Sequence, residues 1–557
     1  MDTIAEMLAA RADDDQDGLL FEDEAYAWRD IVGASAVRGQ AALDLRRPGP
    51  FHIGVLLENV PEFVFWLGAA ALAGAAVVGV NPTRRGAQLG HDITHTDCQL
   101  LVTDRQHLPL LEGLDLGAAE GRLLLVDDPA YQLLLEPFLG AGMPAVSPAP
   151  SETFVLLFTS GSTGAPKAVV CTQGRLARIG ERTTSMYRLT ASTTTYNAMP
   201  LFHGNALMAN WAGVLAAGAT FAMRRKFSAS GWLDDVRRFD ASYFNYVGRA
   251  LAYVLATPEL PDDADNPLEL AFGTEASARD RDRFAARFGC EVVEGYGSSE
   301  GAIAIGRPPQ APSLALGKAL NGADVVVASP ESGRECPTAR FDDHGRLLNG
   351  AEAIGELVGR NVADRFEGYY KNPQAESDRR RDGWYWSGDL GYRDADGWLY
   401  FAGRTSDRLR VDGENFSAAP IEEILSRFPG VVMVAVYPVP DPRTGDQVMA
   451  AVEMAADELF DPASFGPWLA DQKDLGTKWA PKFVRVIEAM PLTATNKVQK
   501  QPLRTAAWHT TDAVYWRPGR ELIYRALSPD DDSLLVSAAA EHGHPLGLAV
   551  YPESDLS

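Results

Sequence analysis

Short apolar runs alternate with helical patterns through the first two thirds of the chain. Helical stretches such as residues 232–239 and 278–288 lie between several of these runs. Strands that end in turns and lead into helices predict an α/β protein with largely parallel sheets, whose ligands gather at the carboxyl ends of the strands. The runs that we interpret as strands read HIGVLLEN, AAVVGVN, QLLVTD, RLLLVDD, FVLLFTS, ATFAMRR, LELAFGT and CEVVEGYG.

Residues 63–80 form an uncharged segment of 18 residues, which touches the lower limit for a membrane span. Pro61 suits the first turn of a helix, Asn59 could cap that helix, and half of the segment is Ala or Gly. We therefore expect a buried helix over residues 61–73, a break at Gly74 and a buried strand that ends before Pro82. No transmembrane segment is expected.

The composition changes after about residue 360. The tight-turn sequence DADG at residues 394–397 predicts a β-hairpin, and a short polar linker follows it. After the linker come a strand near LRVDG, a helix over residues 419–428, two strands and a final helix. We expect a large domain over residues 1–403 with mainly parallel sheets flanked by helices and a β-barrel-like part. A hinge linker over residues 404–409 would join it to a small mobile α+β domain over residues 410–557.

Composition and charge exclude several classes of protein. The chain has 557 residues, 46% hydrophobic and 23% charged, which is typical of a soluble protein with more than one hydrophobic core. A formal net charge of −24 argues against nucleic acid as a partner. Four scattered cysteines fit a reducing compartment, and the acidic N-terminus does not resemble a signal peptide. We expect a cytoplasmic protein.

The stretch TSGSTGAPK, residues 159–167, combines glycines, hydroxyls and a lysine directly after a predicted strand. It is not a P-loop, because Ala165 and Pro166 separate Gly164 from Lys167 and another apparent strand, AVVCT, follows. A strand–loop–strand can still wrap N–H groups and hydroxyls around a polyphosphate; the alternative is a flexible surface turn. The candidate phosphate-binding residues of this stretch are Thr159, Ser160, Gly161, Ser162, Thr163, Gly164 and Lys167.

The longer stretch LLFTSGSTGAPKAVV resembles the phosphate-loop signature of the adenylate-forming superfamily, which comprises acyl- and aryl-CoA synthetases, adenylation domains and luciferases. Further signatures follow in the family's order, over about residues 50–505. Within the superfamily, GRTSDRLRVDGENFSAAPIE and PLFHGNA look most like actinobacterial FadD-type fatty-acyl-CoA ligases. The further signatures read AFGTEAS, EGYGSSEG, GELVGRN with GYYKNP, WYWSGDLGYRDADGWLYFAGR, VDGEN with AAPIE, and PLTATNKVQK.

The resemblance implies an ATP site. Tyr296 would stack on adenine, and Ser299 stands where the family usually has a threonine that touches phosphate. Asp389 would accept hydrogen bonds from both ribose hydroxyls, supported by Arg404. The adenine- and ribose-binding residues implied are Gly273, Thr274, Glu275, Tyr296, Gly297, Asp389 and Arg404.

Three residues are implied as catalytic. Glu300 would hold Mg²⁺, although it could instead be an acid at a helix N-terminus. Lys497 would bridge the attacking carboxylate and the α-phosphate, two anions that need a cation between them; an exposed loop lysine is the alternative. His203 matches a histidine at the mouth of the acyl pocket, or is a structural group.

Two positions depart from the family's pattern. Asn496 precedes Lys497 where the family often has glycine, and asparagine tolerates a left-handed backbone. Ser406 occupies the hinge position, which is commonly Asp or Lys, and a small residue can absorb the rotation. We expect neither departure to abolish activity.

The resemblance implies two half-reactions that use ATP, Mg²⁺ and coenzyme A as co-substrate. A carboxylate attacks the α-phosphorus to give an acyl-adenylate and pyrophosphate. The small domain then swings about Ser406, and the coenzyme A thiol displaces AMP. Gly413 and Glu414 would line the coenzyme A channel.

The acid is not defined by the sequence. The candidate acyl pocket mixes Asn, Trp and Tyr with apolar residues, so the acid could be fatty or a smaller functionalised molecule. Alternatives to the ligase are an adenylating enzyme that loads a carrier protein or activates nitrite, and a scaffold that has lost catalysis. The chain could form a homodimer, and residues 510–557 carry no recognised motif. The pocket residues are His203, Asn205, Met208, Trp211, Tyr246, Val247 and Gly297.

Overall fold

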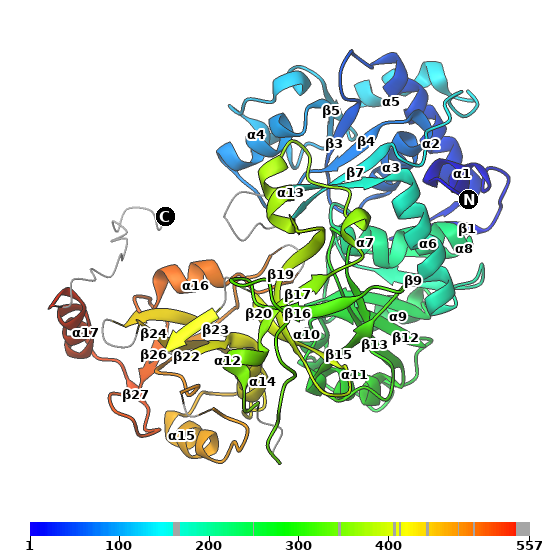
Figure 1. Ribbon diagram of the computed structural model, residues 1–557. Coiled ribbons are helices and arrows are strands. Elements are labelled where there is room, and N and C mark those ends of the chain that lie inside the picture. The colour runs from blue at the N-terminus through cyan, green and yellow to red at the C-terminus, as the bar shows by residue number, and fades with distance from the viewer. Residues whose placement is uncertain are drawn as a thin grey trace. The chain divides into compact units, whose positions relative to one another are not determined.

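The computed structural model describes residues 1–159, 167–248, 250–343, 347–404, 408–411, 414–441, 445–476, 478–493 and 496–541 (Figure 1). The chain packs as two compact units. The first comprises Met1–Glu275, Arg281–Ala302 and Val362–Asp382, and the second comprises Ala276–Asp280, Ile303–Asn361 and Gly383–Ser557. This division by packing is distinct from the hinge expected at residues 404–409, which stays a prediction.

One sheet of the first unit has six strands in the order β6-β5-β3-β4-β7-β8. Neighbouring strands are parallel except for the last pair, β7 and β8. Both predicted strands around residues 159–167 are therefore confirmed, as an antiparallel pair. The bounds are β3 His52–Leu56, β4 Ala76–Gly79, β5 Cys98–Thr103, β6 Leu123–Leu125, β7 Thr153–Thr159 and β8 Lys167–Thr172.

The apolar segment at residues 63–80 forms a buried helix and strand, as predicted. Helix α3 spans Pro61–Ala73, and Gly74 ends it with a left-handed backbone at φ 68° before strand β4. The expectation that Asn59 caps the helix is wrong. Val60 is the N-cap, while the Asn59 amide donates to carbonyl oxygens of two distant segments. No helix among the described residues is long and apolar enough to span a membrane.

The second sheet of the first unit is mainly parallel and runs β13-β12-β11-β9-β10-β1-β2, with only the β1–β2 pair antiparallel. Its carboxyl edge gathers the ends of β9, β11, β12 and β13, as expected for an α/β protein. The bounds are β1 Asp17–Phe21, β2 Glu24–Ala27, β9 Thr194–Asn197, β10 Thr220–Met223, β11 Tyr243–Val247, β12 Leu270–Thr274 and β13 Glu291–Gly297.

Helices flank these two sheets (Figure 1). The predicted helices at residues 232–239 and 278–288 are confirmed as α9 and α11. The remaining bounds are α1 Ile4–Ala9, α2 Trp28–Asp44, α4 Gly86–His95, α5 Pro129–Leu135, α6 Gln173–Tyr187, α7 Gly204–Ala206, α8 Ala212–Ala217, α9 Trp232–Arg238, α10 Ala250–Leu255, α11 Ala278–Phe288 and α13 Pro373–Arg379.

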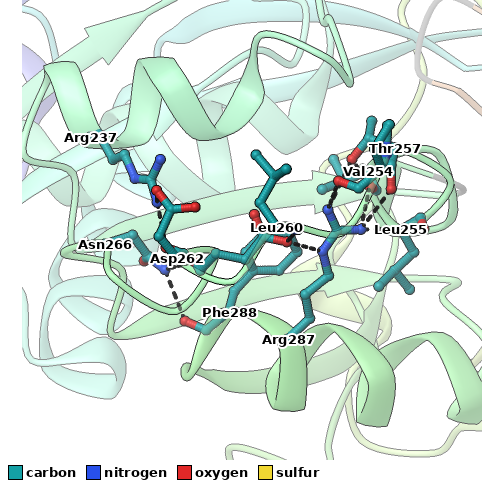
Figure 2. A network of polar contacts seen from close by, with 11 residues as sticks. Arg237, Val254, Leu255, Thr257, Leu260, Asp262, Asn266, Arg287 and Phe288 are labelled. Carbon is teal, nitrogen blue, oxygen red and sulfur yellow. Dashed lines mark hydrogen bonds and ion pairs between the residues drawn. The ribbon is translucent and has the colours of Figure 1, made fainter.

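Side-chain hydrogen bonds hold the connection between β11 and β12 in place. Figure 2 shows Arg287 pointing into the segment after α10, where it donates to the carbonyl oxygen of Thr257 at 3.0 Å and to that of Leu255 at 3.4 Å. Asn266 donates to the carbonyl oxygen of Phe288 at 3.0 Å in the same network. Because Leu255 is the last residue of α10 and Thr257 follows it, the guanidinium takes the place of missing backbone donors at this helix end. The crossover between the two strands is thereby fixed.

The second unit contains an antiparallel run of strands, β16-β17-β19-β20-β15-β14. The hairpin predicted at DADG is confirmed, because β19 and β20 pair with Tyr392 opposite Tyr400. Among the described strands this run is open and forms no closed barrel, which corrects the expected β-barrel-like part. The bounds are β14 Ala304–Gly306, β15 Ala315–Ala319, β16 Val325–Ala328, β17 Gly355–Gly359, β19 Trp384–Arg393 and β20 Leu399–Arg404.

The C-terminal part of this unit is α+β, as predicted, with strand order β22-β21-β24-β25-β26-β27 and β23 paired with β24. The sequence did not predict strands β25 to β27. The bounds are β21 Arg408–Val411, β22 Glu414–Ser417, β23 Val431–Asp441, β24 Gly445–Met454, β25 Phe483–Ile487, β26 Ala513–Trp516 and β27 Arg525–Ala526, with helices α12 Gly350–Ala353, α14 Ala418–Leu425, α15 Pro462–Ala470, α16 Lys500–Ala506 and α17 Pro529–Glu541.

Candidate active site

The β7–β8 pair positions the candidate phosphate loop. Thr159 and Lys167 lie opposite each other as the last paired residues of the two strands. An antiparallel pair brings the two ends of a short loop together, so Lys167 is held at the base of the loop. The candidate residues Ser160, Gly161, Ser162, Thr163 and Gly164 lie outside the described residues.

Lys167 lies against the ring of Tyr369. Its side chain is only 8% exposed, and its Nζ atom is 5.4 Å from the ring centroid, within cation–π range. Burial lowers the pKa of Lys167, as does the positive charge of Arg379, while Asp378 and Glu300 oppose the shift. The ring is fixed because residues 368–370 run beside β8, where Tyr370 N–H donates to the Ala168 carbonyl at 2.8 Å.

Glu300 is a buried carboxylate, 7% exposed, in a turn that follows β13. The chain continues from this turn without a helix, so the alternative of an acid at a helix N-terminus is wrong. The Tyr369 hydroxyl donates to Glu300 Oε1 at 2.8 Å. No ion pair within 4.0 Å is found for this carboxylate among the described residues, so it can still take a cation.

The donor set fits a single Mg²⁺. Carboxylate oxygen is a ligand that Mg²⁺ prefers, and Mg²⁺ is commonly held by one or two carboxylates together with phosphate oxygens and water. Within the described ranges no group of three or more His, Cys, Asp or Glu residues is arranged around one point. Glu300 would therefore contribute one ligand, and the bound nucleotide and water would contribute the rest.

The candidate adenine-binding residues follow neighbouring strands. Gly273 and Thr274 end β12, and Tyr296 and Gly297 end β13. A side chain at Gly273 would collide with the Tyr246 ring, since an added Cβ would lie 2.5 Å from it. Glu275 has a left-handed backbone at φ 72°, a conformation that costs energy in a residue other than glycine and is concentrated at functional sites.

The segment from His203 to Trp211 lies beside the phosphate site. An added Cβ at Gly204 would be 2.9 Å from Ser299 Oγ and 3.6 Å from Met208 Sδ, so both side chains pack against this glycine. Residues Leu207–Trp211 form a π-helical turn, a feature that is frequent at functional sites. His203 and Met208 are partly exposed, whereas Trp211 is 2% exposed and stacks on Phe154.

Two of the candidate pocket residues belong to β11, and they differ in surroundings. Val247 ends the strand opposite Thr274 of β12. Tyr246 is fully buried, and its hydroxyl donates to Glu294 at 3.4 Å. Side chains alternate along a strand, so Tyr246 faces the opposite side of the sheet from Asn245. Asn205 therefore lies at the face of the sheet that carries Asn245, to which it is hydrogen-bonded, whereas Tyr246 lies at the opposite face.

Asp389 lies in the second unit at an irregularity of β19. The register shifts after Leu390, and Gly388 has a positive φ of 77°. Such bulges re-aim side chains and are common next to active sites. In the register of the two strands, Asp389 lies opposite Arg404 of β20. Of the other candidates, Glu414 begins β22, while Ser406 and Gly413 lie outside the described residues.

Lys497 sits in a tight turn of the second unit. Its N–H donates to Thr493 Oγ1 at 3.1 Å, and its carbonyl accepts from the Thr493 N–H at 2.7 Å. The expectation for Asn496 is confirmed, because this residue has a left-handed backbone at φ 58°. Asparagine thus supplies the conformation for which the family often uses glycine.

Family models match most of the chain. Residues 42–370 match the model described as AMP-binding enzyme, and residues 420–497 match the model of the AMP-binding enzyme C-terminal domain. The chain belongs to the AMP-binding enzyme family. This places the signatures at both the phosphate loop and Lys497 inside recognised parts of the family.

Curated relatives of this AMP-binding enzyme are similar over almost its whole length. A steroid-22-oyl-CoA synthetase of Rhodococcus jostii is 54% identical over 97% of this chain and 98% of its own. A medium/long-chain-fatty-acid–CoA ligase FadD17 of Mycobacterium marinum is 42% identical over 92% of this chain and 98% of its own. The resemblance to actinobacterial FadD-type ligases is thereby confirmed.

Solved structures share the fold of this AMP-binding enzyme. The anthranilate CoA ligase AuaEII in complex with anthranoyl-AMP aligns with a TM-score of 0.79 at 21% identity, over 91% of this chain and 97% of that chain. A benzoate CoA ligase from Burkholderia xenovorans aligns with a TM-score of 0.78 at 19% identity, over 90% of this chain and 100% of that chain. The chain therefore shares the fold of these CoA ligases, with a large N-terminal part and a small C-terminal part.

The sequence did not identify several polar residues around the site. Tyr369 lies in the recognised stretch GYYKNP, but nothing local links it to Glu300, from which it is 69 positions distant. Arg175 donates to the Ser299 carbonyl at 2.5 Å and so helps to hold the turn before Glu300. Asn210 and Asn245 are fully buried amides. The signal that could have identified them was an asparagine inside an apolar run, because a buried amide needs hydrogen-bond partners.

Proposed function

We propose that the protein is an ATP-dependent acid:CoA ligase. It joins a carboxylic acid to AMP with release of pyrophosphate, and then transfers the acyl group to coenzyme A with release of AMP. The observation that carries the proposal is the 54% identity, over 97% of the chain, to a protein named as a CoA synthetase. The buried Lys167 and the buried Glu300, which both contact Tyr369, support the proposal.

The first step is assigned to residues of both units. Lys167 and the hydroxyls of the phosphate loop hold the pyrophosphate that leaves, and Ser299 contacts phosphate. Bound Mg²⁺ would neutralise charge on the phosphate oxygens. Lys497 stabilises the pentavalent phosphorus, where negative charge accumulates as the carboxylate attacks.

The second step reuses the site after a rearrangement of the small domain. Rotation about Ser406 withdraws Lys497 and brings Gly413 and Glu414 to the channel through which coenzyme A enters. Such domain movements are common in enzymes that carry out two reactions in one site. The thiol then loses its proton and attacks the acyl carbonyl carbon. The bond between this carbon and the phosphate oxygen breaks, and AMP leaves with that oxygen.

The acid that we favour is a steroid with a short carboxylated side chain. The relative named for steroid-22-oyl-CoA is 54% identical, while the relative named for medium and long fatty acids is 42% identical. A compact steroid also suits a pocket wall that contains Asn205 and other polar groups better than a long flexible acyl chain would.

A panel of acids tests this function. The full-length protein is assayed for pyrophosphate release and for CoA thioester with pregnane-20-carboxylic acids and with fatty acids of eight to eighteen carbons, with and without coenzyme A. We expect pyrophosphate release with the steroid acids and thioester only when coenzyme A is present. Robust AMP formation without any CoA thioester would instead favour another acceptor, such as a carrier protein.

The proposed enzyme works in the cytoplasm. All four of its cysteines are free thiols, as a reducing compartment allows. A homodimer is part of the proposal, and light scattering of the purified protein measures the mass that decides between one chain and two.

A further inference from the structure

Four polar side chains form a continuous hydrogen-bonded relay in the first unit. Thr195 lies on β9, Asn245 lies on the neighbouring strand β11, Asn210 lies in the π-helical turn, and Asn205 lies on α7. Three successive bonds of 2.7 Å join Thr195 to Asn210, Asn210 to Asn245, and Asn245 to Asn205. The first three members are fully buried, with 0% exposure.

The relay has a direction. The Thr195 hydroxyl donates to Asn210 Oδ1, and the Asn210 amide nitrogen donates to Asn245 Oδ1. That nitrogen also lies 3.5 Å from the Tyr196 carbonyl, which can only accept, so nitrogen and oxygen of the Asn210 amide are not interchangeable. The amides of Asn245 and Asn205 must therefore each accept a hydrogen bond with the oxygen atom. Asn205 accepts from Asn245 with Oδ1, and its NH₂ group is directed out of the relay.

The π-helical turn is held by the sheet through β11 and by helix α6. The Tyr243 hydroxyl donates to the Ala209 carbonyl at 2.7 Å, and Thr183 Oγ1 donates to the Met208 carbonyl at 3.2 Å. A π turn leaves backbone carbonyls with poorer helical partners, and these hydroxyls satisfy two of them. Asn210 is thus fixed through its backbone as well as its side chain.

The open end of the relay lies beside the candidate reaction centre. Asn205 follows Gly204, against which Ser299 packs, and is partly exposed, unlike Asn210 and Asn245. Among the described residues, no acceptor forms a hydrogen bond with the Asn205 NH₂ group. His203, Met208 and Ala209 are also partly exposed in this short segment. The NH₂ group therefore points to accessible space next to the phosphate site.

A substrate that carries only a hydrocarbon chain would not require this hydrogen-bonded relay. A wall for an alkyl chain can be built from apolar side chains, and a buried amide is costly unless each of its hydrogen bonds is made. Fully satisfied networks of this kind rigidify a site and fix the direction of a terminal group. Here the terminal group is a neutral donor, which suits a neutral oxygen acceptor.

We propose that Asn205 is a specificity-determining residue whose relay-held NH₂ group donates a hydrogen bond to a hydroxyl or ketone oxygen on the acid. The inference rests on the proposed ligase function and deepens it, because it names a chemical feature of the acid. The enzyme prefers an acid that carries this oxygen to the otherwise identical acid that lacks it. Sites built to bond a substrate oxygen discriminate in this way, and we expect a preference of about tenfold or more in kcat/KM.

The test compares matched acids on the full-length protein. The probes are pregnane-20-carboxylic acid and its 3-, 7- and 12-hydroxy and 3-keto counterparts, each assayed for pyrophosphate release. The variant Asn205→Asp keeps the oxygen that accepts from Asn245 but loses the NH₂ donor, and Asn205→Leu removes both. We expect the preferred oxygenated acid to lose its advantage, so that its kcat/KM ratio to the plain acid falls close to one in both variants.

A second pair of variants tests the relay itself. Thr195→Val removes the first donor without touching Asn205, and Thr195→Ser keeps that donor. We expect the preference to weaken in Thr195→Val and to persist in Thr195→Ser, a difference that loss of packing alone does not predict. Thermal unfolding of both variants checks that each is folded, and this pair gives a result even where Asn205→Leu does not fold.

Two failures are distinguishable. If the parent protein acts on the plain acid and on every oxygenated acid equally well, or if Asn205→Asp keeps the parent's preference, then the inference about Asn205 is overturned while the ligase function stands. If no acid of the panel supports pyrophosphate release, then the proposed function itself is overturned. A preference that falls in Asn205→Asp and Thr195→Val but not in Thr195→Ser supports the relay.

Discussion

At the scale of single residues, the hydroxyl of Tyr369 is the group that joins the two halves of the phosphate site. It donates to the buried Glu300, and its ring lies against Lys167. The adjacent Tyr370 has a different partner, because its hydroxyl donates to Asp97 at 2.6 Å. The neighbouring tyrosines therefore offer a matched pair for mutation.

Tyr369→Phe should weaken the use of Mg²⁺. Without the hydroxyl, Glu300 loses the hydrogen bond that orients it, and loss of such a partner typically costs about 10- to 100-fold in metal affinity. We expect the Mg²⁺ concentration for half-maximal pyrophosphate release to rise about tenfold or more. Tyr370→Phe is the control and should leave this concentration unchanged; equal effects of the two variants would contradict the role of Tyr369.

Asp92 makes stability depend on pH. This carboxyl on α4 is fully buried, and burial raises its pKa from 3.8 to about 6, although Arg84 opposes the shift. Between these values the folded chain holds a proton that the unfolded chain releases. The contribution of Asp92 to the free energy of unfolding therefore falls as pH rises from about 4 to about 6 and is constant above that range.

Asp92→Asn should remove this dependence. The amide is neutral at every pH, so the variant should match the parent near pH 4 and gain on it by on the order of 2 kcal/mol near pH 7. The measurement is the melting temperature of both proteins across this range. A constant difference between the two curves would show that Asp92 does not titrate between pH 4 and pH 7.

At the scale of elements, glycines decide how closely helices pack. Gly33 lies on an exposed face of α2, and an added Cβ there would meet nothing within 4 Å. Gly180 lies on α6, and an added Cβ there would collide with the Ala212 carbonyl oxygen of α8. Both glycines stand inside helices, so an alanine at either position gains the same helix propensity.

The two glycines should respond in opposite directions. Gly33→Ala should stabilise the protein by about 0.5–1 kcal/mol, because alanine loses less backbone entropy on folding. Gly180→Ala should destabilise it, since the collision with α8 outweighs this gain. Thermal unfolding of the two variants checks both, and a gain of stability at Gly180 would mean that α6 and α8 are not in close contact.

Local signals predicted many of the elements. The proline, the glycine and the apolar run were enough to place α3, its left-handed end and β4, because each signal acts within a few residues. Asn59 failed as a cap because tertiary contacts took its amide instead. The relay from Thr195 to Asn205 could not be predicted, since it depends on which strands become neighbours across 50 residues of sequence.

At the scale of the whole molecule, the proposed reaction needs the small domain to occupy two positions. Ser406→Pro should separate the two half-reactions, because proline fixes φ near −65° and restricts the rotation at the hinge. We expect pyrophosphate release to be retained while CoA thioester formation falls about tenfold or more. Ser406→Ala is the control, and it should leave both half-reactions unchanged. An equal loss of both half-reactions in Ser406→Pro would contradict the hinge assignment.

The sequence predicted the family and a large domain followed by a small one, but not the last strands of the small domain, β25 to β27. The last recognised signature, PLTATNKVQK, ends at residue 500, just beyond residue 497, where the C-terminal family model stops. Strands β26 and β27 carry no motif because they contribute structure by pairing with a distant strand, and strand pairing leaves little trace in a two- to four-residue segment. Trp516 of β26 lies opposite Phe483 of β25 in this way.

Because of that pairing, the C-terminal sheet can finish folding only after β26 has been synthesised. Strand β25 has β24 on one side and β26 on the other, and Trp508 stacks on Phe483 at 4.7 Å between ring centroids. Until residues 508–516 leave the ribosome, β25 is an unpaired edge with an aromatic ring uncovered, a state prone to aggregation. Chain termination at residue 500 would keep every recognised signature and still yield an unfinished sheet.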